Sequence, residues 1–202
     1  MIAILLLLAC VTAQAQTAQP VTKVRVDNEG QMYGPLFITS GGQEKQITDQ
    51  AQQAWIINNG WQVVYSSSDG AGGFENEGQS LHRYDVRTGA RKRILAEYFA
   101  VDTVEEVVTS TKQRALLVTM ADGGLGASYV AVVDPRRGEV FFRRWSRIMS
   151  RKGNVIVLGF YREDDWEKLD GDQAMKVRPY KTERHNLNTL LRRRVIVNKR
   201  SP

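Results

Sequence analysis

The most constraining feature of this sequence is a hairpin pattern that returns at a regular interval. Residues 81–95, LHRYDVRTGARKRIL, alternate in polarity on either side of a Thr-Gly pair. This alternation predicts two β-strands joined by a tight turn in which Gly89 adopts a positive φ. The pattern returns in residues 128–143, SYVAVVDPRRGEVFFR, and in weaker form in residues 35–48 and 174–187. Asp134 and Gly138 match Asp85 and Gly89.

Between these hairpins the sequence predicts further short strands. An Asn-Asn-Gly turn at residues 58–60 separates two apolar runs, which is a strong short-range signal for a hairpin. The sequence contains no convincing long amphipathic helix, because the one segment with helical spacing, residues 101–108, is rich in β-branched side chains. The other predicted strands are residues 22–26, 36–39, 44–48, 54–57, 61–67, 104–109, 115–120, 145–149, 154–161, 175–180, 187–191 and 194–198.

The interval between the repeats indicates the architecture. Asp85 and Asp134 are 49 positions apart, and four short strands in about 45–50 residues is the repeat of a β-propeller blade. The segments INNGWQVVYSSSDG and LHRYDVRTGARKRIL resemble the repeats of TolB-like and prolyl-oligopeptidase-type propellers. The resemblance departs from the family at residues 57–60, where Ile-Asn-Asn-Gly replaces a Ser-Pro-Asp-Gly turn. It implies a fold and leaves the activity open.

The strand count predicts an all-β protein, a small β-propeller of about four four-stranded blades. Three complete blades fit between residues 54 and 191. The strands left over at the two ends form a fourth blade, in which pairing of the N- and C-terminal strands closes the ring. Closure removes the exposed strand edges that favour aggregation. The alternatives are an open stack of antiparallel sheets and a β-sandwich.

Residues 1–15 are predicted to be a secretory signal peptide. Residues 2–9 form a short apolar run, and Ala13-Gln14-Ala15 is a small-x-small cleavage site. Residues 16–20 are then a flexible leader and residues 21–202 a single propeller-like domain. We therefore expect a periplasmic or secreted protein. Alternatively, Leu7-Leu8-Ala9-Cys10 resembles a lipoprotein box, and Cys10 anchors the chain. The apolar run is too short to span a bilayer as a helix, so no transmembrane segment is expected.

Composition narrows the function further. With 25% charged and 42% hydrophobic residues, the chain has the composition of a globular protein. Cys10 is its one cysteine, so signal cleavage leaves a domain without disulfides, thiol nucleophiles or thiolate metal sites. The net charge of +6 suits an anionic partner.

Sequence signatures of catalysis are weak. The chain has no G-x-S-x-G motif, and its two histidines, His82 and His185, do not form a pair at metal-ligand spacing. A binding function is therefore favoured over an enzymatic one. The first alternative is a carbohydrate-active hydrolase that uses paired carboxylates from the acidic loops at residues 69–77 and 163–172. The second is a secreted inhibitor or immunity-type protein.

The acidic loop at residues 163–172 is the candidate metal site. Its aspartates offer the hard oxygen ligands that calcium prefers, although the loop does not match an EF-hand and an ordinary solvated loop is the alternative. No other cofactor is expected. The predicted calcium ligands are Asp164, Asp165, Asp170 and Asp172.

Basic turns are the predicted contacts with a partner. In a four-stranded blade the turns after the first and third strands fall on one face, and the remaining loops fall on the other. This rule places Arg91, Arg136, Arg137 and Lys152 on one face and the acidic loop on the opposite one. Trp166, inside the acidic loop, is a further candidate for stacking on a sugar or anchoring a protein.

These features together predict an exported, non-catalytic binding or protein-interaction module with a basic face. The expected partner is an anionic protein or an anionic surface of the cell envelope, and carbohydrate is a second candidate. Nucleic acid is not expected, because an exported protein seldom meets it and the sequence lacks the interleaved aromatic and basic residues of a single-strand binder.

Overall fold

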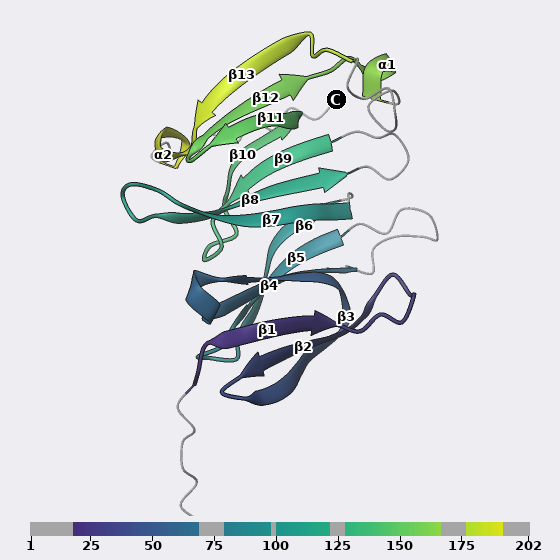
Figure 1. Ribbon diagram of the computed structural model, residues 1–202, viewed down its shortest axis with the longest axis vertical. Helices are drawn as coiled ribbons and strands as arrows, with labels where there is room; N and C mark the ends of the chain where they lie inside the picture. Colours follow the sequence, from purple (N-terminus) through teal and green to yellow (C-terminus); the bar gives the residue numbers. More distant parts are fainter. Residues whose placement is uncertain (1–17, 69–78, 98–99, 122–127, 167–176, 192–202) are drawn as a thin grey trace, which may run out of the picture.

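The computed structural model describes residues 18–68, 79–97, 100–121, 128–166 and 177–191 (Figure 1). Within these ranges the fold is all-β, as predicted, and every strand pairing is antiparallel. The helical segments are η1 (Asn58–Gly60), α1 (Glu163–Trp166) and α2 (Leu187–Leu190). The strands are β1 (Val21–Val26), β2 (Gly34–Ser40), β3 (Gln43–Ile57), β4 (Gln62–Ser68), β5 (Gln79–Asp85), β6 (Arg91–Glu97), β7 (Ala100–Val108), β8 (Arg114–Ala121), β9 (Ser128–Val133), β10 (Val140–Trp145), β11 (Arg147–Lys152), β12 (Val155–Phe160) and β13 (Lys181–Asn186).

The strands form four layers stacked along the long axis of the molecule (Figure 1). Sheet 1 consists of β1, β2 and the first half of β3. Sheet 2 consists of the second half of β3 with β4, β5 and β6. Sheet 3 is β7–β10, and sheet 4 is β11–β13. In sheets 2 and 3 each strand pairs with the next along the chain, which is the four-stranded meander of a propeller blade.

Strand β3 belongs to two sheets. Its first half pairs with β2 and its second half with β4, and Ala51 is the residue where the two ladders meet, with partners Gly34 and Ser67. The sequence predicted two separate strands here, residues 44–48 and 54–57, with a linker between them. The linker instead continues the strand, so the hydrogen-bonded order runs unbroken from β1 to β6.

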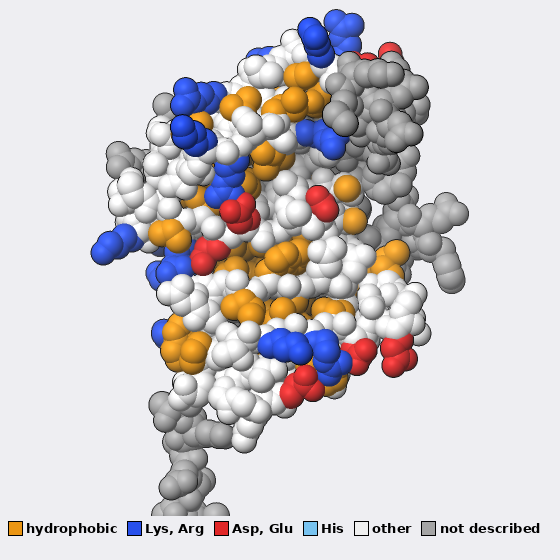
Figure 2. Space-filling view, in the orientation of Figure 1, with side chains coloured by type: hydrophobic (Ala, Val, Ile, Leu, Met, Phe, Trp, Pro, Cys, Tyr) orange, Lys and Arg blue, Asp and Glu red, His pale blue; other side chains and the backbone are white. Residues whose placement is uncertain are grey.

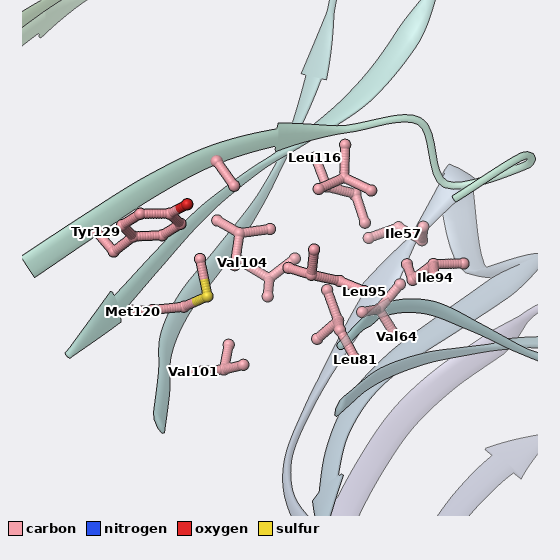
Figure 3. Packing of buried hydrophobic residues seen from close by; sticks show 13 residues of the cluster. Ile57, Val64, Leu81, Ile94, Leu95, Val101, Val104, Leu116, Met120 and Tyr129 are labelled. Atoms are coloured by element: carbon pink, nitrogen blue, oxygen red, sulfur yellow. The ribbon is translucent and has the colours of Figure 1, made fainter. Parts of the chain in front are cut away.

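Three hydrophobic clusters fill the spaces between successive sheets, and strand alternation explains them. On β4, Val64 packs toward sheet 3, whereas Val63 and Tyr65 pack against sheet 1. On β8, Leu116 belongs to the cluster between sheets 2 and 3, and Leu117 belongs to the cluster between sheets 3 and 4. Both faces of sheets 2 and 3 are therefore buried, which accounts for the nearly continuous apolar runs of their central strands. Figure 3 shows the cluster between sheets 2 and 3.

A buried glutamine links the first three sheets. Gln79, at the start of β5, is 3% exposed. Its amide nitrogen donates to Oε1 of Gln52 (2.5 Å) and to the Tyr33 hydroxyl (3.4 Å), and its oxygen accepts the N–H of Val101 (2.8 Å). Tyr33 precedes β2 and Val101 lies in β7. The side chain thus satisfies its own buried polar groups while joining sheets 1, 2 and 3.

The end of sheet 4 differs from the sequence prediction. The predicted strands at residues 175–180 and 187–191 are wrong: residues 177–180 precede β13, and Leu187–Leu190 is the helix α2. Leu187 and Leu191 are four positions apart and both buried against sheet 3, which is the spacing of one helix face. Asn186 caps the helix by accepting a backbone N–H.

Closure of the ring stays a prediction. In the described part of the chain β1 pairs only with β2 and β13 only with β12, and these two strands lie at opposite ends of the stack (Figure 1). The strand predicted to join them, residues 194–198, lies outside the described residues, as do the predicted signal peptide and Cys10. No helix among the described residues is long and apolar enough to cross a membrane.

Candidate functional site

The turns after alternate strands of sheets 2–4 come together along one edge of the stack, which we name the turn edge (Figure 1, left). The N–H of Asn58 donates to a carboxylate oxygen of Glu106 in β7 (3.0 Å). The side-chain amide of Asn154 donates to the carbonyl oxygen of Val108 (3.1 Å). The turn that follows β9 is likewise bonded to β6. The turn edge therefore comprises residues 58–61, 86–92, 108–114, 134–139 and 151–154.

A lysine of sheet 2 holds the turn between β9 and β10. The Lys92 ammonium donates to the carbonyl oxygens of Arg136 (3.2 Å) and Arg137 (2.8 Å). The Arg83 guanidinium donates to the carbonyl oxygen of Pro135 (3.0 Å). A Cβ on Gly138 would lie 3.1 Å from the Ile94 carbonyl oxygen, so the turn packs closely on the β6 backbone. These contacts fix the backbone that carries Arg136 and Arg137.

The local form of this turn follows from the repeated sequence. Oδ1 of Asp134 accepts the N–H groups of Arg136 (2.6 Å) and Arg137 (3.1 Å), and Gly138 has φ 71°. The matching turn after β5 is built in the same way, with Asp85 accepting two N–H groups and Gly89 at φ 70°. Short acidic side chains stabilise such turns, and glycine supplies the positive φ.

Several cations of the turn edge are already engaged. Arg151 forms an ion pair with Glu105, and Arg114 pairs with Glu106 at 2.7 Å. The Arg87 guanidinium lies over the Trp61 ring, 4.0 Å from its centroid. Because a carboxylate offsets the charge of Arg114 and of Arg151, these two arginines contribute less positive field to solvent than unpaired cations do.

Other cations at this edge point to solvent. Lys112, Arg136, Arg137 and Lys152 are exposed and have no acidic partner within the part of the chain that the structure describes. On the face drawn in Figure 2, Lys and Arg side chains lie along the left margin, at the top and at the lower centre, and Asp and Glu side chains lie in the centre, at the lower right and at the upper right. The turn edge therefore presents a positive field that is suited to an anion.

Asp85 carries a pH dependence that can be tested. Partial burial works against its charged form, but bonds from the Gln62 amide and the N–H groups of Thr88 and Arg87 outweigh it, so its pKa is lowered from 3.8. A lowered pKa contributes stability above the unfolded-state value, and that stability is lost as the pH falls through the folded-state value. We expect Asp85→Asn to destabilise the protein at neutral pH and the difference to shrink below pH 3.8. Urea unfolding of the wild-type protein and the variant, from neutral pH to below pH 3.8, measures the difference in the free energy of unfolding. A difference that stays constant over this range would contradict the lowered pKa of Asp85.

The structure places four of the five predicted partner-binding residues along the turn edge. Arg136 and Arg137 share one turn, and Lys152 lies at the start of the turn between β11 and β12. Arg91 lies beside Lys92, but adjacent residues of a strand point to opposite faces. It pairs with Tyr84, on the side of sheet 2 that packs against sheet 1. Arg91 therefore lies on the turn edge, but its side chain does not face the turn that carries Arg136 and Arg137.

The acidic candidates lie elsewhere. Asp164 and Asp165 belong to α1, which follows the end of β12, whereas Lys152 precedes its start, so the two sit at opposite ends of that strand (Figure 1). Asp170 and Asp172 lie outside the described residues. No group of three or more His, Asp or Glu side chains suitable for a metal ion occurs among the residues described. Calcium binding thus stays a prediction, and so does the role of Trp166, whose backbone alone is described.

Lys92 is the functional candidate that the sequence did not single out. Lys92 lies in the basic run 91–93, between two arginines. Nothing in the sequence indicates which of these three side chains contacts another part of the fold. Only the packing of sheet 3 on sheet 2 shows that Lys92 faces the turn after β9. Contacts of this kind depend on which blade follows which, and not on local spacing.

No known protein family matches the chain, and neither does any curated relative. Among solved structures it is similar to the β-propeller domain of the Trilobed protease from Pyrococcus furiosus, with 14% identity and a TM-score of 0.46 over 67% of this chain and 42% of that one. It is also similar to Pyrococcus horikoshii acylaminoacyl peptidase, with 15% identity and a TM-score of 0.46 over 72% of this chain and 28% of that one. An acylaminoacyl peptidase in complex with a chloromethyl ketone matches at 16% identity and a TM-score of 0.45, over 69% and 26%. The chain spans less than half the length of each.

Proposed function

We propose that this protein is an exported, non-catalytic binding module whose turn edge docks an anionic partner. The observation that supports this most directly is the turn between β9 and β10, where Arg136 and Arg137 are exposed while their backbone is bonded from sheet 2 through Lys92. Cations on a fixed backbone lose less conformational entropy on binding than cations on a loose loop. Periplasmic or secreted localisation is part of the proposal.

The proposal assigns separate roles to the basic residues. Arg136, Arg137 and Lys152 attract and contact the partner, with Arg91 adding to the field from the neighbouring turn. Arg114 and Arg151 hold β7 through their ion pairs with Glu106 and Glu105, and they serve the fold. A binding surface and a structural ion-pair network thus share one edge without sharing residues.

We expect binding to anionic probes to be strong at low salt and to depend on four cations. The probes are poly-L-glutamate and vesicles that contain phosphatidylglycerol, with phosphatidylcholine vesicles as the uncharged reference. Raising the salt from 0.1 M to 1 M shortens the Debye length from about 10 Å to about 3 Å, so binding should weaken steeply. The substitutions Arg91→Glu, Arg136→Glu, Arg137→Glu and Lys152→Glu, combined in one variant, should abolish it. Co-sedimentation and fluorescence anisotropy measure the binding.

A matched control separates the turn edge from net charge. Reversing four exposed cations elsewhere, Lys23, Arg162, Arg178 and Arg184, changes the net charge by the same amount. We expect this variant to keep most of the binding, and Asp164→Asn with Asp165→Asn to leave it unchanged. If both four-residue reversals weaken binding equally, the attraction belongs to the net charge and the turn edge has no special role.

A further inference from the structure

The apolar core between sheets 1 and 2 ends before it reaches strand β6. Of the described residues, those that sheet 2 contributes to this core come from β3, β4 and β5 and from Val86, and none comes from β6. On β6, Arg91 and Arg93 are the cross-strand partners of Tyr84 and His82, so they point to the same face of the sheet as those rings. Both arginines are exposed. The face of sheet 2 that packs against sheet 1 therefore changes from apolar to cationic at its last strand.

Aromatic side chains connect the core to these arginines. Tyr65 of β4 pairs with His82 of β5, and their rings stack with centroids 5.3 Å apart and planes 16° from parallel. Burial raises the pKa of the Tyr65 hydroxyl, and the positive charge of Arg91 works against that rise. The Arg91 guanidinium therefore lies close enough to the buried ring to act on it. Both arginines stand beside an aromatic surface that the core holds in place.

A lysine of sheet 1 approaches the same place. Lys45, near the start of β3, is the cross-strand partner of the buried Ile38, so its side chain points toward sheet 2. The Lys45 ammonium donates to the Tyr84 hydroxyl (3.3 Å) and lies 5.8 Å from the centroid of that ring. The Cβ atoms of cross-strand partners such as Tyr84 and Arg91 are about 4.5–5.5 Å apart. The Lys45 ammonium and the Arg91 guanidinium are therefore within reach of one ligand.

The charge of this cluster is not balanced within the part of the chain that the structure describes. Lys45, Arg91 and Arg93 form no ion pair there. Glu44, the acidic residue adjacent to Lys45, points to the opposite face of sheet 1, where it pairs with Arg25 at 3.2 Å. Like charges held near one another repel, so a bound anion stabilises the arrangement.

We propose that Lys45, Arg91 and Arg93 form a binding site for a phosphate monoester group at the rim of the space between sheets 1 and 2. This site goes beyond the proposed function, which depends on the turn after β9. Arg91 and Arg93 face sheet 1, whereas Lys92, between them, faces sheet 3 and bonds that turn. The two sites therefore lie on opposite faces of β6.

The number and type of the cations select this ligand. A phosphate monoester carries a charge of about −1.5 to −2 at pH 7 and has three strong acceptor oxygens. Successive residues on one face of a strand are about 7 Å apart, so Arg91 and Arg93 can bond different oxygens of one phosphate group. The Lys45 ammonium supplies the third positive charge. A carboxylate has two oxygens, which one guanidinium bonds in full, so it would leave two of the three cations unused.

The test uses the complete protein with glycerol 3-phosphate, and dimethyl phosphate is the diester reference. We expect saturable binding of glycerol 3-phosphate that is at least about tenfold tighter than binding of the diester, which carries one charge. Lys45→Gln combined with Arg93→Gln should weaken it at least about tenfold, because two charge-assisted contacts are lost. The matched control, Lys23→Gln with Arg184→Gln, removes an exposed lysine from β1 and an exposed arginine from β13 and should bind normally. Titration calorimetry at low salt measures affinity, and circular dichroism checks that each variant is folded.

A phosphate monoester occurs both in soluble esters and in the head group of phosphatidic acid. Vesicles that contain phosphatidic acid are therefore compared with vesicles that carry the same charge as phosphatidylglycerol, whose phosphate is a diester. A preference for phosphatidic acid that is lost in the Lys45→Gln, Arg93→Gln variant identifies a lipid head group. Binding of glycerol 3-phosphate without that preference identifies a soluble ester. Both results support the site.

The proposal is overturned if glycerol 3-phosphate shows no saturable binding, if the diester binds equally well, or if the control variant loses as much affinity as the site variant. Each of these results leaves the proposed function standing, because binding of poly-L-glutamate depends on the turn after β9. A further variant, Arg136→Glu with Arg137→Glu, should weaken binding of poly-L-glutamate and keep binding of glycerol 3-phosphate. If it loses glycerol 3-phosphate as well, the phosphate binds at the turn and the proposed site is wrong.

Discussion

Gly60→Ala is expected to destabilise the protein by about 2–5 kcal/mol. Gly60 closes the turn between β3 and β4 with φ 87°, a conformation that costs an L-residue about 1–2 kcal/mol. A Cβ at this position would also lie 2.6 Å from the Val21 carbonyl oxygen and 2.9 Å from Cβ of Pro20. Backbone atoms cannot move aside as a flexible side chain does, so overpacking adds about 1–3 kcal/mol. Urea denaturation measures the loss.

Gly89→Ala is the matched control for this prediction. Gly89 has φ 70°, but a Cβ there would meet nothing within 4 Å. The control therefore carries the conformational cost without the contact, about 1–2 kcal/mol. The difference between the stability losses of the two variants therefore measures the cost of the close contact between Gly60 and residues Pro20 and Val21. Equal losses would mean that the start of β1 does not pack on this turn.

Leu116→Ala is the second large effect that we expect, at about 2–5 kcal/mol. Leu116 is fully buried in the cluster between sheets 2 and 3, where it faces side chains from β3, β5 and β6 (Figure 3). Truncation leaves a cavity between two sheets that are held together by side chains, and rigid sheets collapse poorly around such a space. The loss is a large share of the 5–15 kcal/mol that is typical of a domain.

Val108→Ala tests whether the effect comes from the inter-sheet cluster. Val108, like Leu116, is a branched apolar residue of sheet 3, but it is 46% exposed. We expect a change within about 0.5 kcal/mol, as for most surface positions. Thermal melts of both variants, analysed beside the wild-type protein, provide the comparison. Similar midpoints for the two variants would contradict the layered core.

The hairpins were predictable because their signals are local. Asp85 with Gly89 and Asp134 with Gly138 define turns through bonds that span four residues. Alternation over five or six residues then identifies the flanking strands. β13 shows where this reasoning stops: its inward residues include Glu183 and His185, which bond one another at 3.0 Å, so the strand has no apolar alternation. Such an edge strand is stabilised by the neighbouring ladder and not by its own pattern.

The candidate site was predictable in its parts and not in its assembly. The repeat placed Arg136, Arg137 and Lys152 on one edge, because alternate turns of a meander must share a side. It did not reveal that Arg114 and Arg151 are paired with carboxylates of β7, nor that Lys92 holds the turn after β9. Those contacts join residues more than 40 positions apart or lie across two strands, where sequence spacing carries no information on side-chain direction.

The shared strand β3 has a consequence for how the protein opens. A continuous backbone ladder runs from β1 to β6, whereas the ladder stops between β6 and β7 and again between β10 and β11. Sheets 1 and 2 should therefore exchange their amide hydrogens as one cooperative unit, with β2 protected as long as β4 and β5 are. Within the described residues no strand ladder joins sheets 3 and 4, so we expect β12 to lose protection while β8 keeps it. We therefore expect the array to open as three units and not four, with the larger unit at the N-terminal end.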